Sequence, residues 1–232
     1  MASTAFDCVL LSAGKSTRTH QWKMMLPCGD STVIEASARA ALEACGRLIV
    51  VAGHRAGELA ALFRGRERVE VVVNPRFEEG MLSSIRCGCE RVRTPRFFLA
   101  LGDMPLVDPA TYLRLAAGPV VDAVIPKYRG KKGHPLLLSS EVARAVVAGS
   151  LPAGLIGVTL RTILAGFPTL LVPVEDPHIL QDLDTDEDYR RLAAEAACEP
   201  ALRGAGPRGG RRVPAPGPAH RRFPAGGRPG LP

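Results

Sequence analysis

Long apolar runs are absent from this sequence of 232 residues, and no basic segment followed by an apolar one opens it. A membrane-spanning helix needs about 20 apolar residues in succession, so the sequence argues against an integral membrane protein or a membrane partner. We therefore expect a cytoplasmic protein. A chain of this length can form one domain with a sizeable hydrophobic core.

Paired cysteines are also missing, because none of the six cysteines belongs to a CxxC motif. Cys87 and Cys89 are close in sequence, but they lie in a segment with a helical pattern, where positions i and i+2 face different ways. This spacing argues against a zinc site and against a disulfide framework. We expect free thiols in a reducing compartment.

Acidic residues are missing from residues 201–232, which hold seven of the 30 basic residues and are rich in Gly, Pro, Ala and Arg. Residues 1–200 are formally neutral, with 23 basic and 23 acidic residues. The net charge of +7 therefore belongs to the last segment, whose composition cannot build a core. We expect one folded domain over 1–200 and a disordered tail over 201–232. The tail is either a polyanion-binding arm or the product of a shifted reading frame.

A phosphate-binding glycine is missing from the AGKST motif at 13–17, which otherwise resembles the end of a P-loop. That loop requires a glycine five residues before Gly14, and the residue there is Val9, within the apolar run CVLL. This run is typical of a buried strand. A P-loop ATPase or GTPase is therefore disfavoured, and the small residues need another explanation.

The sequence does contain apolar strand patterns that alternate with helical patterns. Strands are predicted at 7–12, 47–53, 69–74, 96–102, 122–126 and 169–175, and helices at 31–45, 56–64, 83–92, 109–117, 140–148, 157–165 and 186–196. This alternation predicts a single Rossmann-like α/β domain of three layers with a mostly parallel sheet. Ligands of such folds bind beyond the carboxyl ends of the strands, so the residues after each strand are the candidate site.

Two strand ends carry residues suited to a nucleotide triphosphate. Ser12, Ala13 and Gly14 form a turn of small residues that lets backbone amides approach phosphates. Arg18 and Lys23 follow in a polar loop within reach of the same phosphates. Asp103 stands alone after the strand at 96–102 and is placed to bind Mg²⁺, although capping of a loop or helix is the alternative. Asp108, before Pro109, is the better candidate for a helix cap.

Three further segments carry candidate residues with plainer alternatives. Ser83 and Ser84 sit where a helix is expected to begin, so they can bind an anion or a base edge, or Ser83 can cap the helix. The loop KYRGKKGHPLLL holds four basic residues and His134, which suits an anionic acceptor or a solvated hairpin. Asp184 either binds a second metal ion or marks the start of the last helix.

Taken together, these segments resemble the nucleotidyltransferases of molybdenum-cofactor biosynthesis, the MobA-like NTP transferases. The family pattern of an LAAG-type turn, then S-x-R-M-G, then K-x-L-L-P corresponds to LLSAGKSTRTHQWKMMLP at 10–27. NPRFEEGMLSSIRCG, LALGDMPLV, GKKGHPLLL and DLDTDEDY match later motifs in the same order. The resemblance covers about residues 6–196 and is strongest to the cytidylyltransferase branch.

This resemblance implies a fold like that of the nucleotide-diphospho-sugar transferases and a role for each matched residue. The turn at 12–14 and the backbone of Lys15 would bind nucleotide, with Ser83 and Ser84 beside it. Arg18 and Lys23 would bind phosphates and act with Asp103 in catalysis. Asp103 would hold Mg²⁺, Asp184 would be a second metal or acceptor residue, and His134 would lie near the pterin.

The implied reaction transfers CMP from CTP to the terminal phosphate of molybdenum cofactor and releases pyrophosphate, for use by a molybdenum hydroxylase client. Relatives that use GTP carry Gly-Gly in this turn, where this chain has Ser12-Ala13-Gly14. The extra methyl group narrows the space beside the base and favours a pyrimidine, so guanylyl transfer from GTP is the alternative within the family. Thr19-His20 replaces the family's Met-Gly, and GLIG at 154–157 lacks an expected Asp. The Thr19-His20 departure keeps open a non-catalytic, nucleotide-binding accessory protein for hydroxylase maturation. Specific nucleic-acid binding is disfavoured because the excess charge is confined to the tail.

Overall fold

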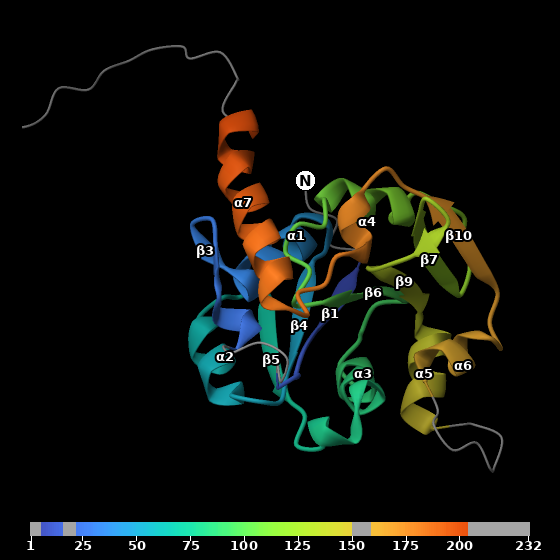
Figure 1. Ribbon diagram of the computed structural model, residues 1–232. Coiled ribbons are helices and arrows are strands. Elements are labelled where there is room, and N and C mark those ends of the chain that lie inside the picture. The colour runs from blue at the N-terminus through green and yellow to red at the C-terminus, as the bar shows by residue number, and fades with distance from the viewer. Residues whose placement is uncertain (1–5, 16–21, 150–158, 204–232) are drawn as a thin grey trace, which may run out of the picture.

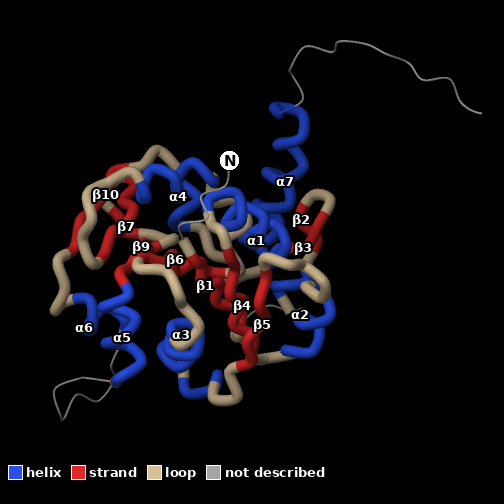
Figure 2. Tube along the Cα trace, turned by 180° about the vertical axis from the view of Figure 1, so that it is seen from behind, coloured by secondary structure: helices blue, strands red, loops and turns tan. Residues whose placement is uncertain are grey.

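The computed structural model describes residues 6–15, 22–149 and 159–203, with residues 196–203 described by their backbone alone. Figure 1 shows a central sheet with helices on both of its faces, and Figure 2 shows the same arrangement from behind. No helix among the described residues is both long enough and apolar enough to span a membrane.

The main sheet has eight strands in the order β10-β7-β9-β6-β1-β4-β5, with β8 paired to β7 outside this path. A separate small sheet pairs β2 with β3. The strand bounds are β1 (Asp7–Ser12), β2 (Pro27–Cys28), β3 (Ser31–Thr32), β4 (Arg47–Ala52), β5 (Val69–Val73), β6 (Arg96–Leu101), β7 (Ala123–Tyr128), β8 (Lys131–Lys132), β9 (Leu136–Ser139) and β10 (Thr169–Pro173). Strand β1 lies parallel to β4 and β6, so the carboxyl ends of these strands meet at one edge.

Helices cover both faces of the sheet, because alternate residues of each strand point to opposite sides. The α-helices are α1 (Val33–Ala44), α2 (Ala56–Leu62), α3 (Met81–Cys89), α4 (Pro109–Ala116), α5 (Ser140–Ala148), α6 (Leu160–Leu164) and α7 (Asp186–Arg203), and the 3-10 helices are η1 (Lys23–Met25), η2 (Phe77–Glu79) and η3 (Pro177–Leu180). Cys8 and Leu10 pack with α1 and α4, whereas Val9 and Leu11 pack with α3 and α5. The expected three-layer α/β domain is confirmed.

The helix starts follow the local sequence. Thr32 caps α1 and forms a reciprocal capping box with Glu35, which satisfies backbone amides that have no partner inside the helix. Asp108 caps α4, and Pro109 occupies the first helical position, where a missing N–H costs nothing. The cap predicted at Asp108 is therefore confirmed.

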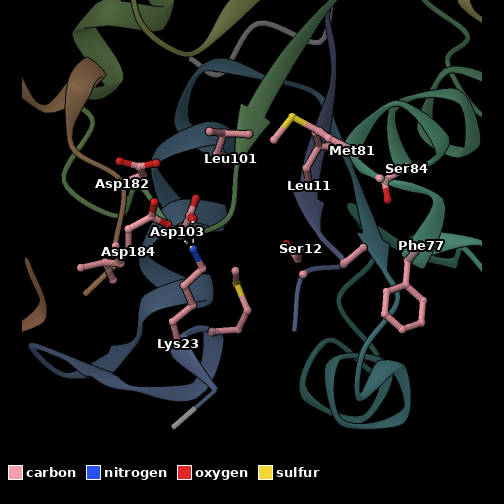
Figure 3. A pocket seen from close by; sticks show the side chains of 15 residues that line it. Leu11, Ser12, Lys23, Phe77, Met81, Ser84, Leu101, Asp103, Asp182 and Asp184 are labelled. Carbon is pink, nitrogen blue, oxygen red and sulfur yellow. Dashed lines mark hydrogen bonds and ion pairs between the residues drawn. The ribbon is translucent and has the colours of Figure 1, made fainter. Parts of the chain in front are cut away.

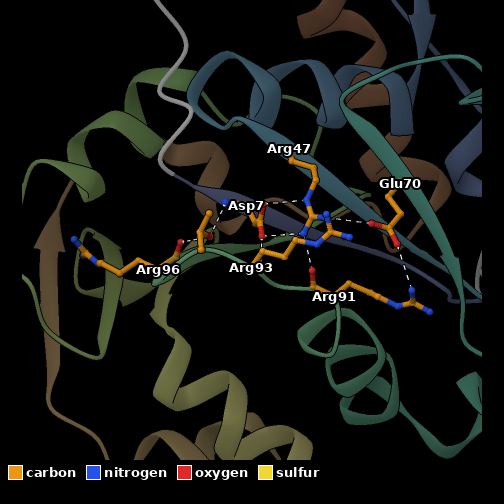
Figure 4. Close-up of polar contacts among 7 residues, drawn as sticks. Asp7, Arg47, Glu70, Arg91, Arg93 and Arg96 are labelled. Carbon is orange, nitrogen blue, oxygen red and sulfur yellow. Dashed lines mark hydrogen bonds and ion pairs between the residues drawn. The ribbon is translucent and has the colours of Figure 1, made fainter.

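A buried ion pair fixes the opposite edge of the sheet, where β1 begins (Figure 4). The carboxylate of Asp7 accepts hydrogen bonds from Arg47 Nε and Nη2, at 3.1 and 3.0 Å, and from the backbone N–H of Arg93, at 2.7 Å. Glu70 also pairs with Arg47 and with Arg91. A buried charge with this many partners avoids a large desolvation penalty, so the network holds β1 in register with β4.

The segment expected as a basic loop at 127–138 is partly strand. Arg129 and Gly130 have positive φ angles of 44° and 86°, as in the tightest hairpin turns, and they join β7 to β8. Strand β9 then runs antiparallel between β6 and β7. Its apolar run is short and follows a polar hairpin, so the pattern alone does not distinguish it from a loop.

The last helix is longer than expected, since α7 continues to Arg203 and passes the predicted domain boundary at 200. Residues 204–232 lie outside the described residues, so the tail remains a prediction.

Candidate functional site

A pocket of about 430 Å³ opens at the carboxyl ends of β1 and β6, where the parallel fold predicts a ligand site. In Figure 3, Asp103, Asp182, Asp184 and Lys23 line one side, while Phe77, Met81 and Ser84 line the other. Its lining residues are Leu11, Ser12, Ala13, Gly14, Lys23, Met24, Phe77, Gly80, Met81, Ser84, Leu101, Asp103, Asp182, Leu183 and Asp184.

The turn of small residues that follows β1 forms the floor of this pocket. Ser12 Oγ is buried and has no hydrogen-bond partner among the described residues. A Cβ at Gly102 would lie 2.4 Å from that oxygen, so only glycine fits beside it. No atom of the described residues lies within 4 Å of where a Cβ of Gly14 would stand.

Gly53, directly after β4, supports two lining residues of the pocket, and the sequence analysis missed it. A Cβ there would lie 2.6 Å from the Phe77 side chain and 2.9 Å from the Ala13 methyl. The His54 N–H also donates to the Ala13 carbonyl, at 3.1 Å. Gly53 therefore lets Ala13 and Phe77 pack close together, and any larger residue at this position would push one of them away.

Lys23 links two carboxylates that are distant in sequence. Its Nζ lies 2.5 Å from Asp103 Oδ2 and 3.4 Å from Asp184 Oδ1. The side chains of Lys23 and Asp103 are only 13% and 14% exposed, so this contact is largely shielded from water. The structure thus brings together three of the predicted residues, from η1, the end of β6 and the segment before α7.

Asp182 is a third carboxylate in the pocket, and the sequence analysis did not single it out. Its pKa is raised, first by burial and then by the nearby charges of Asp184 and Asp103, with Lys23 partly opposing them. The segment is tied to β6 because the Leu183 N–H donates to the Asp103 carbonyl, at 3.2 Å. The alternation of Asp182 and Asp184 is a signal that could have found it, since residues i and i+2 of an extended chain share a side.

These carboxylates fit a hard divalent cation. The ammonium of Lys23 already lies between Asp103 and Asp184, so the position favours positive charge. Within the described ranges, no cluster of three or more His, Cys, Asp or Glu side chains is arranged to hold a metal ion unaided. Mg²⁺ commonly binds through one or two carboxylates together with substrate phosphates, and this donor set matches that arrangement.

The two serines of α3 have different positions. Asn74 Nδ2 donates to Ser83 Oγ at 2.9 Å and to Ser84 Oγ at 3.0 Å, which orients both hydroxyls. Ser84 lines the pocket, whereas Ser83 is not among the lining residues and donates to the Arg76 and Gly80 carbonyls. Capping by Ser83, the simpler alternative, is wrong: α3 begins at Met81, so Gly80 occupies the cap position and Ser83 lies inside the first turn. The orienting role of Asn74 was missed.

Lys15 is not among the described lining residues of the pocket. It pairs with Glu78 on the surface, its ammonium lies 5.7 Å from the Phe77 ring centroid, and its side chain is 47% exposed. This contact is what lowers the pKa of Glu78. Arg18, Thr19 and His20 lie outside the described residues, so the predicted phosphate contact of Arg18 stays a prediction.

His134 lines a different and larger cavity, of about 1010 Å³, which shares Leu11 and Met81 with the first. Burial lowers the pKa of its imidazole, although the Leu99 carbonyl and the charge of Asp103 oppose this shift. Its Nδ1 is buried and has no hydrogen-bond partner among the described residues. The imidazole is therefore neutral near pH 7 and stands beside the first pocket rather than within it.

Comparison with known proteins places these features in a family. Residues 8–167 match the model of the MobA-like NTP transferase domain. The chain is 31% identical over 187 residues to the molybdenum cofactor cytidylyltransferase of Escherichia coli K12, covering 80% of this chain and 94% of that protein.

Solved structures agree with this result. A nucleotidyl transferase from Methanothermobacter has 27% identity and a TM-score of 0.72, covering 84% of this chain and 98% of that chain. Rv0371c from Mycobacterium tuberculosis, in complex with manganese, has 29% identity and a TM-score of 0.63, covering 84% and 100%. CMP:2-keto-3-deoxy-manno-octonic acid synthetase complexed with CTP, at 14% identity and a TM-score of 0.67, shares the fold. The chain therefore belongs to the MobA-like NTP transferase family and is a nucleotidyltransferase with the fold of the nucleotide-diphospho-sugar transferases.

Proposed function

We propose that the protein transfers CMP from CTP to the terminal phosphate of molybdenum cofactor and releases pyrophosphate. The name of the Escherichia coli relative supports this assignment. The observation that carries it is the contact of Lys23 with Asp103 and Asp184 beside the open turn at Gly14. A phosphate-binding lysine, cation-binding carboxylates and accessible backbone amides are what a triphosphate requires.

In this proposal the turn at residues 12–14 and the backbone of Lys15 hold the triphosphate, while Ser84 lies beside the nucleotide. Ser83 acts with it through their shared partner, Asn74. Lys23 leaves its carboxylate partners when nucleotide binds and donates to the phosphates. Arg18, from the same polar loop, supplies a second phosphate contact. The protein thereby exchanges an internal ion pair for a contact to the ligand.

No side chain of the protein needs to form a covalent bond in this reaction. An oxygen of the acceptor's terminal phosphate forms a bond to the α-phosphorus of CTP, and the bond from that phosphorus to pyrophosphate breaks. The acceptor phosphate is already an anionic nucleophile near pH 7, so no general base is needed. The side chains bring two anions together and stabilise the charge that develops on the departing oxygens.

Mg²⁺ is the proposed cofactor, held by Asp103 and Asp184. When bound, it would neutralise phosphate charge and orient the reacting groups. The mycobacterial relative was solved in complex with manganese, which supports a divalent cation as the cofactor.

CTP is the proposed donor because of Ala13. Ala13 lines the pocket, and its methyl group would narrow the space beside the base, which favours a pyrimidine over a purine. A single methyl group changes selectivity by only about 1–3 kcal/mol, so GTP is the alternative within the family. A non-catalytic accessory role is disfavoured by membership of a transferase family. A molybdenum hydroxylase remains the proposed client.

A pyrophosphate-release assay tests the proposal. The wild-type protein is mixed with Mg²⁺, molybdenum cofactor and each of the four NTPs, with Asp103→Asn as the matched variant. We expect release with CTP that depends on the acceptor and falls by at least about a hundredfold in Asp103→Asn, in line with the loss of a principal charge-stabilising group. Equal release by the two proteins would remove Asp103 from the reaction.

A further inference from the structure

Trp22, the only tryptophan in the sequence, stands directly before Lys23. Its side chain is 6% exposed and packs in the hydrophobic core. The Trp22 carbonyl accepts a hydrogen bond from the Met25 N–H, at 3.2 Å, which closes the single turn of η1. The buried ring therefore anchors the backbone from which Lys23 reaches Asp103 (Figure 3).

The turn that follows β4 contacts this ring with two side chains. The imidazole of His54 meets it edge to face, with ring centroids 6.0 Å apart and an interplanar angle of 86°. The guanidinium of Arg55 lies over it, with Cζ 4.9 Å from the ring centroid. A cation is attracted to the negative face of an aromatic ring, and tryptophan provides the strongest contact of this kind. Two neighbouring residues of one turn therefore hold the ring that precedes Lys23.

The same turn also contacts the chain that follows β1. The His54 N–H donates to the Ala13 carbonyl at 3.1 Å, and a Cβ at Gly53 would lie 2.9 Å from the Ala13 methyl. Ala13 and Lys23 both line the nucleotide pocket. The turn at residues 53–55 thus contacts both segments that are proposed to hold the triphosphate.

Arg55 has a backbone conformation that residues other than glycine rarely adopt. Its φ and ψ angles are 52° and 37°, in the left-handed region. It precedes α2 but makes no side-chain cap bond, as Ser, Asp or Asn would. Its guanidinium instead donates to Glu58 through Nε and Nη2, the latter at 2.7 Å. Neither the backbone conformation nor the cap favours arginine here, so the contact with Trp22 is what this side chain supplies.

The indole N–H gives the Trp22 ring no anchor of its own. Nε1 is buried and has no hydrogen-bond partner among the described residues. A buried indole N–H usually donates to a group that fixes the ring, and leaving it unpaired carries a desolvation penalty. The orientation of this ring therefore depends on core packing and on the contacts with His54 and Arg55.

We propose that Arg55 is a positioning residue for nucleotide binding. It acts through Trp22, whose ring it holds so that Lys23 and the turn at Ala13 face the triphosphate together. The step from Lys23 to the triphosphate rests on the proposed function, whereas the contact between Arg55 and Trp22 does not. Without the guanidinium the ring is free to shift, and nucleotide affinity falls because binding must then order Lys23 as well.

Calorimetric titration of the protein with CTP and Mg²⁺, and in parallel with GTP and Mg²⁺, tests this role in the absence of acceptor. Arg55→Asn removes the guanidinium but keeps a residue type that tolerates the left-handed conformation. It should raise the Kd of the nucleotide that the wild type binds by about tenfold. Arg55→Lys should keep the Kd within about threefold of the wild type, since an ammonium is also attracted to the ring face.

The fluorescence of Trp22 reports on the first step directly, because the chain has no other tryptophan. In the free protein, Arg55→Asn should shift the emission maximum to longer wavelength, as water gains access to the ring. Arg66→Asn is the matched control. Arg66 also lies over an aromatic ring, 5.6 Å from the centroid of Phe63, and pairs with a carboxylate, that of Glu35, but it does not line the nucleotide pocket. Its emission maximum and nucleotide Kd should equal those of the wild type.

Steady-state kinetics separates positioning from a folding defect. With molybdenum cofactor as acceptor, Arg55→Asn should raise the KM for CTP by about tenfold and leave the acceptor KM unchanged. A merely structural defect would instead lower kcat through a smaller active fraction and leave both KM values unchanged.

Equal nucleotide Kd values for Arg55→Asn and Arg66→Asn would overturn the proposal, whether or not the emission shifts. A wild-type protein that binds neither CTP nor GTP would overturn it as well. If the wild type binds a nucleotide but forms no product, the proposed function fails, while the comparison of Kd values still decides the role of Arg55.

Discussion

At the scale of single residues, Lys15 and Lys23 have opposite environments. Lys15 is exposed and pairs with Glu78, whereas Lys23 is shielded and contacts Asp103 in the pocket. A P-loop would require Lys15 to be the essential phosphate lysine. The geometry supports Lys23 instead.

Lys23→Ala should lower kcat/KM with CTP by at least about tenfold, because a contact to phosphate is worth about 1.5–3 kcal/mol. Lys15→Ala should lower it only a few-fold, since the side chain is outside the pocket and its backbone amide remains. Steady-state kinetics on both variants measures the difference. The opposite ranking would show that the loop has been assigned wrongly.

The sequence was informative about residues that follow strands and much less so about those that orient them. Asp103 and Lys23 could be predicted because parallel strands end at a common edge. Asn74 was missed because one amide at a strand end carries no distinctive spacing, although it holds both serines of α3. Gly53 was missed because its role depends on contact with Phe77, which only the fold creates.

At the scale of secondary-structure elements, the packing of α3 on β1 depends on Gly88. A Cβ at this position would lie 2.3 Å from Val9 Cγ1 and 3.0 Å from Val51 Cγ2, both in the sheet. Gly57 in α2 is the contrasting case, since no described atom lies within 4 Å of where its Cβ would stand.

Gly88→Ala should reduce the free energy of unfolding by about 1–3 kcal/mol, because the helix must move away from the strand. Gly57→Ala should be neutral or increase it by up to about 1 kcal/mol, because alanine restricts the unfolded chain and favours helix. Urea denaturation of both variants measures these changes. Similar destabilisation by the two substitutions would mean that contact with Val9 is not the cause.

His178 connects two parts of the chain: the segment that leads to Asp184, and helix α7. Its Nδ1 lies 3.0 Å from Asp176 and its Nε2 lies 3.3 Å from Glu195. The hydrogen bond to Asp176 is the largest cause that raises the pKa of His178, and Glu195 adds to it, against partial burial. A raised pKa in the folded state means that protonation of this histidine stabilises the fold. The contribution is complete below the unfolded pKa of about 6.5 and is lost as pH rises through the higher folded value.

The Tm difference between wild type and His178→Gln should accordingly be larger at about pH 6 than at about pH 9. Thermal unfolding at both pH values measures this difference. Glu195→Gln, made in the wild-type protein with His178 kept, should reduce the dependence of Tm on pH. A difference that is constant with pH would show that the histidine acts by packing alone.

Strands and helices with long periodic patterns were predictable to within a few residues, as β1 and α5 illustrate. Strands β8 and β9 were not, because β9 is short and its antiparallel place between β6 and β7 is set by tertiary contacts. The paired strands β2 and β3 were not predicted either, because a strand of two residues is too short to show an alternating pattern.

At the scale of the whole molecule, the described residues form one domain to which the last segment adds charge but little apolar surface. Residues 204–232 contain Val213, Phe223 and Leu231 as their only large apolar side chains. Truncation after Arg203 should therefore leave Tm and kcat unchanged, while weakening retention on a heparin column because arginines are removed. A clear fall in Tm would show that this segment packs on the domain.

The central claim concerns the reaction itself, and the mass of its product tests it most directly. The full-length protein is incubated with Mg²⁺, molybdenum cofactor and an equimolar mixture of the four NTPs, and the product is analysed by mass spectrometry. We predict one dominant adduct, heavier than the acceptor by one CMP unit, formed together with pyrophosphate. A GMP adduct would contradict the choice of CTP. An acceptor that stays unmodified in the presence of folded protein would contradict the proposed transfer.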